Sequence, residues 1–242
     1  MKICIAQTKA LKGDIAANID NHIRFITYAS LLKASSIFFP ELSLTGYEPE
    51  LTKDIAITAG DDRLSVFQKL SNKNTITIGV GIPEKTEIGI RISMVIFQPD
   101  KPVITYSKQQ LHSDELPFFV EGTEQVILTI DDKKVAPAIC FESLQPDHSE
   151  NAINLGAELY LASVAKPQRG LEKALVHFPA VAKKYKVPVL MSNCIGYCDN
   201  FMSAGYSSVW TKQGELVGQL DDKKEGIIIF DTENEEAILR IL

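Results

Sequence analysis

Glu41, Lys108 and Cys140 each come directly after a short apolar stretch that is predicted to be a strand. Ligands collect at strand ends in open α/β sheets, so we expect an acid, a cation and a thiol to meet there. A thiol attacks as the thiolate, and with an ordinary pKa near 8.5 it needs a base and a cation nearby at pH 7. Each residue alone also fits a structural role, as a loop carboxylate, a solvated cation and a small buried side chain.

Together the three residue types predict acyl transfer through a thioester. Glu41, in a partly desolvated pocket that raises its pKa, would take the thiol proton and later protonate a departing amine. Lys108 would stabilise the tetrahedral oxyanion together with the backbone N–H of Phe141. The acyl group would rest on Cys140 until water, activated by Glu41, releases a carboxylic acid.

The apolar pattern predicts strands joined alternately by single helices and by hairpins. Strands are expected at residues 2–7, 36–39, 75–80, 91–98, 103–107, 125–130, 134–140, 159–163, 187–193, 204–210, 216–220 and, as the last strand, 226–231. Helices are expected at about 15–34, 64–70, 147–155 and 171–185, the last broken at Pro179. Hairpins exclude an all-parallel sheet, and a single open sheet rarely exceeds ~10 strands. We therefore expect an α/β fold of two stacked mixed sheets with helices on the outer faces.

Composition and charge limit the class of protein. The 242 residues are 45% hydrophobic and 23% charged with a formal net charge of −6, which predicts one globular domain over residues 1–242 and no nucleic-acid or membrane partner. The N-terminus becomes polar at Gln7 and Lys9, before a signal peptide could form, so a cytoplasmic location is expected. The four cysteines are too few for a disulfide scaffold and are expected to be reduced.

Three regions of the sequence resemble the signatures of the nitrilase, or carbon-nitrogen hydrolase, superfamily. They are residues 39–47, residues 106–111 with 115–122, and residues 139–142 followed by Gly156-Ala157. Later stretches at 190–193 with Gly196, and at 205–208 running into Gly214-Glu215, are similar to that family's later landmarks, so the resemblance covers nearly the whole chain.

The resemblance implies an α-β-β-α sandwich, a homodimer or larger assembly, and a Glu-Lys-Cys triad at Glu41, Lys108 and Cys140. It places the family's second glutamate on Glu115, which would position the water, with Asp114 as the only rival. It also implies a small-molecule amide or N-carbamoyl substrate, and because the sequence contains no metal or cofactor motif, neither group is expected. The amide is preferred to a nitrile by analogy with the family.

Departures from the family pattern bear on the substrate and on assembly. Val181–Lys186 replaces the family's Arg-Ala and Glu-Asn signature, and the chain ends soon after the last expected strand. Ser163–Lys166 stands where the family often has an aromatic residue or proline near the substrate, and His177-Phe178 replaces the more usual His-Trp. Phe141 with other phenylalanines could wall an apolar slot, and Lys166 and Arg169 could receive a substrate carboxylate or could simply be solvated.

Other functions remain open on the residues alone. A cysteine-histidine pair would use His112, His148 or His177 as the base, although no local protease signature surrounds Cys140. The Cys194–Cys198 pair could be a redox or metal site, but its Cys-x₃-Cys spacing favours a structural role. Residues 79–81, Gly-Val-Gly, lack the third glycine of a dinucleotide loop. An acyl transferase with the same triad and a non-catalytic binding module of the same fold are the remaining alternatives.

Overall fold

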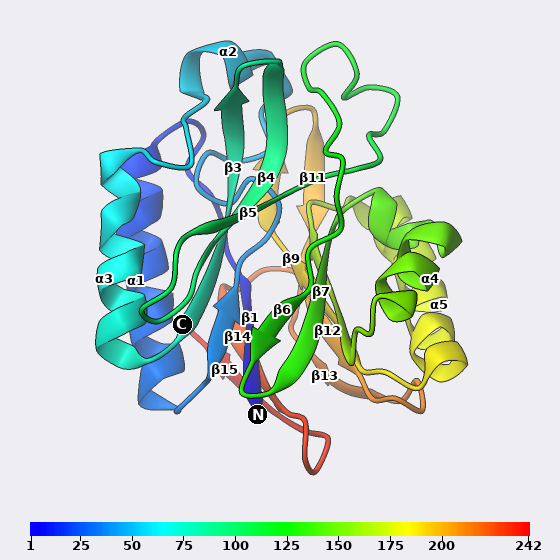
Figure 1. Ribbon diagram of the computed structural model, residues 1–242. Helices are drawn as coiled ribbons and strands as arrows, with labels where there is room; N and C mark the ends of the chain where they lie inside the picture. Colours follow the sequence, from blue (N-terminus) through cyan, green and yellow to red (C-terminus); the bar gives the residue numbers. More distant parts are fainter.

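Two sheets stack face to face in the computed structural model, which describes residues 1–242, and helices cover the outer face of each sheet (Figure 1). The first sheet contains, in spatial order, β15 (Glu236–Ile241), β14 (Gly226–Asp231), β1 (Lys2–Gln7), β2 (Ser36–Phe38), β3 (Thr77–Thr86), β4 (Gly89–Phe97) and β5 (Ile104–Ser107). The second contains β13 (Leu216–Gln219), β12 (Ser208–Trp210), β9 (Val189–Asn193), β8 (Leu159–Val164), β7 (Lys133–Ile139) and β6 (Leu128–Ile130). A separate hairpin pairs β10 (Ile195–Cys198) with β11 (Phe201–Ala204).

The longer helices are amphipathic and lie against one sheet each. They are α1 (Ile15–Leu31), α3 (Ser65–Asn74), α4 (Pro146–Asn154) and α5 (Gln168–Tyr185), with a short α2 (Thr52–Ile55) and 3₁₀ turns at Pro49–Leu51, Asp62–Leu64 and Glu142–Leu144. In α1 the Asp14 side chain accepts a hydrogen bond from the Ala17 N–H at the N-terminus, and Ile15, Ile19 and Ile26 face inward at helical spacing. Helix α1 and α3 cover the first sheet, and α4 and α5 the second (Figure 1).

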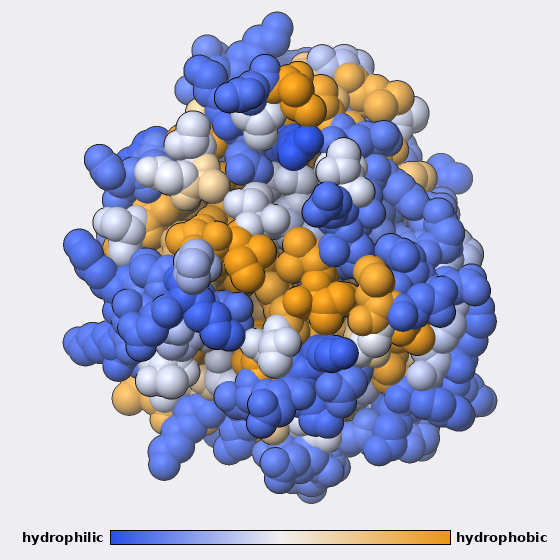
Figure 2. All heavy atoms as spheres, in the orientation of Figure 1, coloured by the Kyte–Doolittle hydropathy of each residue, from blue (hydrophilic) through white to orange (hydrophobic).

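Three apolar layers separate these elements. The central layer joins the inner faces of the two sheets, with Ile5 and Phe38 from one sheet against Leu161 and Leu190 from the other. The outer layers join each sheet to its own helices. Figure 2 shows apolar residues gathered across the middle of the face in view, between the helical layers on either side. This arrangement confirms the predicted α/β class and the α-β-β-α sandwich of two mixed sheets.

Strand direction brings the predicted site residues to one end of the sandwich. Strands β1, β2 and β3 are parallel, and β5 has the same direction because β4 reverses between β3 and β5. In the second sheet β7, β8 and β9 are parallel. Glu41 follows β2 and Lys108 follows β5, while Cys140 follows β7 and Lys166 follows β8.

Four details of the predicted element pattern were wrong. Helix α5 continues through Pro179, because Phe178, Val181 and Ala182 are buried on both sides of the proline and hold the helix on the sheet. β14 is not the last strand, since β15 pairs with it at the sheet edge. The expected strand at 75–80 extends to Thr86 and forms a hairpin with β4. The expected strand at 204–210 is confined to β12, and the β10–β11 hairpin that precedes it was not expected.

None of the helices combines the length and the apolar composition that crossing a membrane requires.

Candidate active site

The loop that carries Glu41 packs directly on the backbone of β3. A Cβ atom at Gly81 would lie 2.5 Å from the Leu42 nitrogen and 2.7 Å from the Pro40 oxygen, so only glycine permits this approach. Gly81 also accepts a 3.0 Å bond from the Leu44 N–H, and its own N–H donates to the Ser43 hydroxyl at 3.1 Å. Gly81, in a stretch that matches no cofactor motif, therefore fixes the position of the Glu41 loop.

Lys108 is fully buried between two carboxylates. Its ammonium donates to Glu41 Oε1 at 2.8 Å and to Glu115 Oε1 at 2.6 Å. The Glu115 carboxylate also accepts from the Tyr47 hydroxyl at 3.0 Å and from the His112 N–H at 2.7 Å. Asp114 instead pairs with the His112 ring at 2.6 Å. Glu115 is thus the carboxylate that the structure joins to Lys108, and its rival Asp114 is not.

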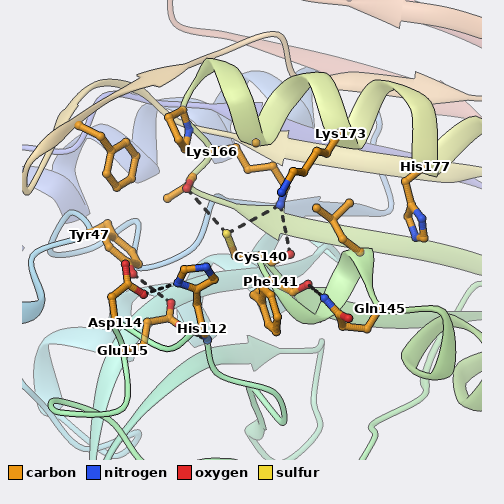
Figure 3. A pocket seen from close by; sticks show the side chains of 15 residues that line it. Tyr47, His112, Asp114, Glu115, Cys140, Phe141, Gln145, Lys166, Lys173 and His177 are labelled. Atoms are coloured by element: carbon orange, nitrogen blue, oxygen red, sulfur yellow. Dashed lines mark hydrogen bonds and ion pairs between the residues drawn. The ribbon is translucent and has the colours of Figure 1, made fainter.

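Cys140 lies at a sharp turn between β7 and the 3₁₀ turn that follows. Its φ of +47° is in the left-handed region, which non-glycine residues seldom adopt and which recurs at functional sites. Its N–H donates to the Ser163 carbonyl at 3.0 Å, which joins it to the end of the neighbouring strand β8. The thiol lies 3.7 Å from the Ala165 carbonyl and 3.9 Å from the Lys166 ammonium (Figure 3).

Glu142 joins the Cys140 turn to the Lys108 segment from behind. Its carboxylate accepts from the Ile139 N–H at 2.7 Å, the Gln109 N–H at 2.6 Å and the Tyr106 hydroxyl at 2.6 Å. Burial raises the pKa of Glu142 to about 7, although these hydrogen bonds oppose the increase. This one buried carboxylate therefore links the Cys140 turn of the second sheet to the end of β5 in the first sheet.

Electrostatics in the cluster favour a neutral thiol at rest and a basic Glu41. Burial raises the pKa of Cys140 to about 12, with Glu41 adding to the effect and Lys166 and Lys108 opposing it. Burial also raises the pKa of Glu41, and Lys108 opposes that increase. Burial disfavours the charge of Lys108, but Glu41 and Glu115 outweigh it and raise its pKa. The Oε2 atom of Glu41 is buried and has no hydrogen-bond partner, so it is free to accept a proton.

A cavity of about 490 Å³ opens over the thiol. Its apolar lining includes Tyr47, Phe141 and Phe201, and its polar lining includes Lys166 and His177 (Figure 3). Its size suits a small molecule. Cys140 and Glu115 reach the cavity wall, whereas Glu41 and Lys108 lie behind them, outside the lining.

The predicted substrate-binding residues are only partly brought together. Phe141 and Lys166 line this cavity, but Arg169 does not. Arg169 is exposed on α5 and lines a shallower neighbouring depression with Glu172 and Val176. Arg169 lies in the first turn of α5 and Lys166 precedes that helix, so a ligand over the thiol meets Lys166 and not Arg169.

The structure offers no histidine as a hydrogen-bonded base for Cys140. His148 is bonded to the hydroxyls of Tyr106 and Tyr160, His112 is bonded to Asp114, and none of the thiol's hydrogen bonds involves an imidazole. His177 lines the cavity with its Nε2 atom unpaired.

Cys194 and Cys198 lie with their sulfur atoms 3.5 Å apart as buried free thiols. No group of three or more His, Cys, Asp or Glu side chains is arranged to hold a metal ion.

Sequence reasoning assigned no role to Tyr47 or Glu142, although both fall inside the signature stretches. Tyr47 supports Glu115, and Glu142 supports the Cys140 turn. The contact between Lys166 and Cys140 was also missed, since a lysine at a strand end looks the same whether it faces solvent or a neighbouring turn. For the close approach of the Glu41 loop to β3, the only sequence signal was the pair Gly79 and Gly81 within an alternating strand.

Comparisons with known proteins agree with this geometry. The family model described as carbon-nitrogen hydrolase matches residues 2–238. The chain is 24% identical to the glutamine-dependent NAD(+) synthetase of Thermotoga maritima over 98% of this chain, and it spans only 43% of that synthetase. It is 26% identical to a probable nitrilase of Schizosaccharomyces pombe, covering 83% of this chain and 76% of that protein.

Among solved structures, an amidase variant from Nesterenkonia sp. AN1 superposes with a TM-score of 0.86 at 22% identity, covering 95% of this chain and 89% of that one. That structure shows the acetamide moiety of fluoroacetamide covalently added at the active-site cysteine of the amidase. This likeness confirms the fold. Because the family model spans nearly the entire sequence, the chain belongs to the carbon-nitrogen hydrolase family, the nitrilase superfamily.

Proposed function

We propose that this protein hydrolyses a non-peptide C–N bond of a small amide or N-carbamoyl amine, through a thioester on Cys140. The main support is that the Cys140 thiol, the Glu41 carboxylate with its unpaired Oε2 and the Lys108 ammonium lie together beside a cavity of small-molecule size. Each of the three follows a different strand, and together they supply the nucleophile, base and cation that acyl transfer requires.

In the first half-reaction Glu41 Oε2 takes the thiol proton while the Cys140 sulfur bonds to the substrate carbonyl carbon. The carbonyl π electrons move to oxygen, and Lys108 with the Phe141 N–H stabilises that oxyanion. Glu41 then gives its proton to the leaving nitrogen, the C–N bond breaks, and ammonia or an amine departs.

In the second half-reaction Glu41 removes a proton from water, which adds to the thioester carbonyl carbon. Glu115, which is fixed by Lys108, Tyr47 and the His112 N–H, positions this water from the cavity wall. Collapse of the intermediate breaks the C–S bond, the thiolate recovers the proton from Glu41, and a carboxylic acid leaves.

The amide is favoured over the nitrile by two comparisons. The solved neighbours are amidases, and the synthetases that match most of this chain are named as glutamine-dependent, glutamine being a primary amide. Because other relatives are named as nitrilases, nitriles are included among the substrates to be tested. The acyl transferase alternative differs only in whether water or an amine cleaves the thioester.

The test is a screen of ammonia and amine release from small amides, N-carbamoyl amines and nitriles, with and without hydroxylamine as an acyl acceptor. Cys140→Ala is expected to lower kcat by at least ~10³-fold, because only binding and oxyanion stabilisation remain. Free acid formed in the absence of hydroxylamine supports hydrolysis, whereas release of acyl product only when an amine acceptor is added identifies a transferase. Undiminished turnover in Cys140→Ala would end the covalent mechanism, whereas no turnover of any of these substrates by the wild type would leave the binding-module interpretation.

A further inference from the structure

Lys166 is a buried cation without a carboxylate partner. Of the 25 lysines and arginines, only Lys108 and Lys166 are buried, and both lie at this site. Lys108 is paired with two glutamates, whereas no ion pair joins Lys166, which is 3% exposed, to any acid. Burying an unpaired ammonium is costly, so a nearby group must compensate for the lost hydration.

The groups that the Lys166 ammonium does contact both belong to Cys140. Its Nζ lies 3.2 Å from the Cys140 carbonyl oxygen and 3.9 Å from the sulfur (Figure 3). The carbonyl is a neutral acceptor, so the full compensation comes only when the sulfur is charged.

The backbone on either side of Lys166 is held in place. Its N–H donates to Asn193 Oδ1 at 2.9 Å, and its carbonyl accepts from the Ala204 N–H at 2.8 Å and the Ser203 hydroxyl at 3.3 Å. Asn193 ends β9, and β11 supplies the other two donors. The strand ends therefore fix the backbone from which the Lys166 side chain reaches the sulfur.

The charge count of the cluster is consistent with this placement. Glu41, Glu115, Lys108 and the Cys140 thiol carry a net charge of −1 together, and Lys166 brings the sum to zero. When the thiol proton moves to Glu41 the sum does not change, but the negative charge moves to the sulfur, next to Lys166. Lys166 also opposes the rise in the Cys140 pKa more strongly than Lys108 does.

From these contacts we infer that Lys166 is a further catalytic residue, whose ammonium is the counter-ion of the Cys140 thiolate while Glu41 holds the proton. This inference rests on the proposed function, in which Cys140 is the nucleophile. It gives the two lysines separate tasks, since Lys166 stabilises the attacking sulfur and Lys108 the oxyanion that forms next.

The test measures alkylation of Cys140 by iodoacetamide from about pH 6 to pH 10, with the labelled residue identified by peptide mass spectrometry. In this reaction the sulfur bonds to the methylene carbon, iodide leaves, and the thiol proton passes to Glu41 or solvent, so the rate follows the thiolate fraction and needs no substrate. The buried thiols of Cys4, Cys194 and Cys198 serve as internal controls.

The other charged or titratable groups around the sulfur stay unchanged when Lys166 is replaced. They are Glu41, Lys108 and Glu115 in the cluster and Tyr47, His112, Asp114, Lys173 and His177 around the cavity. Lys166→Met, similar in length and uncharged, is expected to alkylate about tenfold more slowly at every pH from about 6 to about 10, because loss of the ammonium raises the Cys140 pKa by about one further unit. Lys166→Arg is expected to keep the wild-type rate.

Lys173→Met is the matched control, since it removes an exposed lysine from the same cavity and is expected to leave the rate unchanged. If Lys166→Met fails to fold, Lys166→Gln is expected to show the same decrease in rate, because it retains a donor without the charge. A Lys166→Arg rate as low as that of Lys166→Met, or a Lys166→Met rate equal to that of the wild type, would mean that the charge of Lys166 does not stabilise the thiolate and would overturn the inference. Absence of Cys140 labelling in the wild type together with full turnover of Cys140→Ala would instead refute the proposed function.

Discussion

Gly81→Ala tests whether the close contact between β3 and the Glu41 loop positions the base. The new Cβ would lie 2.5 Å from the Leu42 nitrogen, 2.7 Å from the Pro40 oxygen and 2.9 Å from the Ser43 nitrogen, all of them backbone atoms of the loop that carries Glu41. Ordinary contact begins at 3.4 Å, so the loop must retreat by about 0.9 Å. The 2.8 Å bond between Glu41 and Lys108 does not survive such a displacement unaltered.

Overpacking of this kind costs roughly 1–3 kcal/mol. For a chain of this length the expected decrease in Tm is about 2–12 °C, at about 2–4 °C per kcal/mol. Misplacing a catalytic group by about 1 Å can cost ~10²-fold in rate, so kcat is expected to fall between ~10-fold and ~100-fold in the variant that remains folded.

The assay compares thermal unfolding, ammonia release and Cys140 alkylation in Gly81→Ala and in Gly60→Ala. Gly60 is the matched control because a Cβ there meets nothing within 4 Å and its φ is not positive. Gly60→Ala is expected to match the wild type in all three measurements. A Gly81→Ala protein with wild-type Tm and kcat within twofold of wild type would refute the positional argument.

Three further outcomes are expected. Burial raises the pKa of Glu142 to about 7, so between its ordinary pKa and about 7 the folded chain binds more protons than the unfolded chain and loses stability as pH rises. The Tm of Glu142→Gln should therefore decrease less than that of the wild type between about pH 5 and pH 8. Parallel Tm profiles of the two proteins would contradict this. Arg169→Ala should leave the kcat/KM ratio for paired carboxylate-bearing and neutral amides unchanged, because Arg169 lies outside the cavity, whereas a changed ratio would place it at the substrate. Sedimentation equilibrium is expected to give twice the mass of one chain, as the family resemblance implies, and a monomer at micromolar concentration would exclude the homodimer.

The layers of the fold were predictable because they follow from local pattern. Periodic apolar residues define α1, and Pro40 ends the apolar stretch before Glu41. The β15 edge strand was missed because its exposed face mixes charged and apolar residues, as edge strands often do. Pro179 was misread because local propensity forecasts a break, while packing on both sides of it decides the outcome.

At the site, residue types were predictable and contacts were not. Glu41, Lys108 and Cys140 stand out because each follows an apolar strand, and the structure brings them together. Lys166 and Arg169 looked equivalent from the sequence, since their separation by the strand end and the first turn of α5 is a matter of three-dimensional direction. The Lys166 backbone is bonded to Asn193, from a strand more than twenty residues later, and no local pattern reveals that bond.

In the proposed reaction the substrate's acyl group becomes attached to Cys140. Rapid acid quenching of the wild-type protein during turnover of an amide substrate, followed by peptide mass spectrometry, measures this attachment directly. We expect an acyl adduct on the peptide containing Cys140, removed by hydroxylamine and absent from Cys140→Ala. Steady turnover with no adduct at Cys140 under any quench condition, and retained turnover in Cys140→Ala, would contradict it.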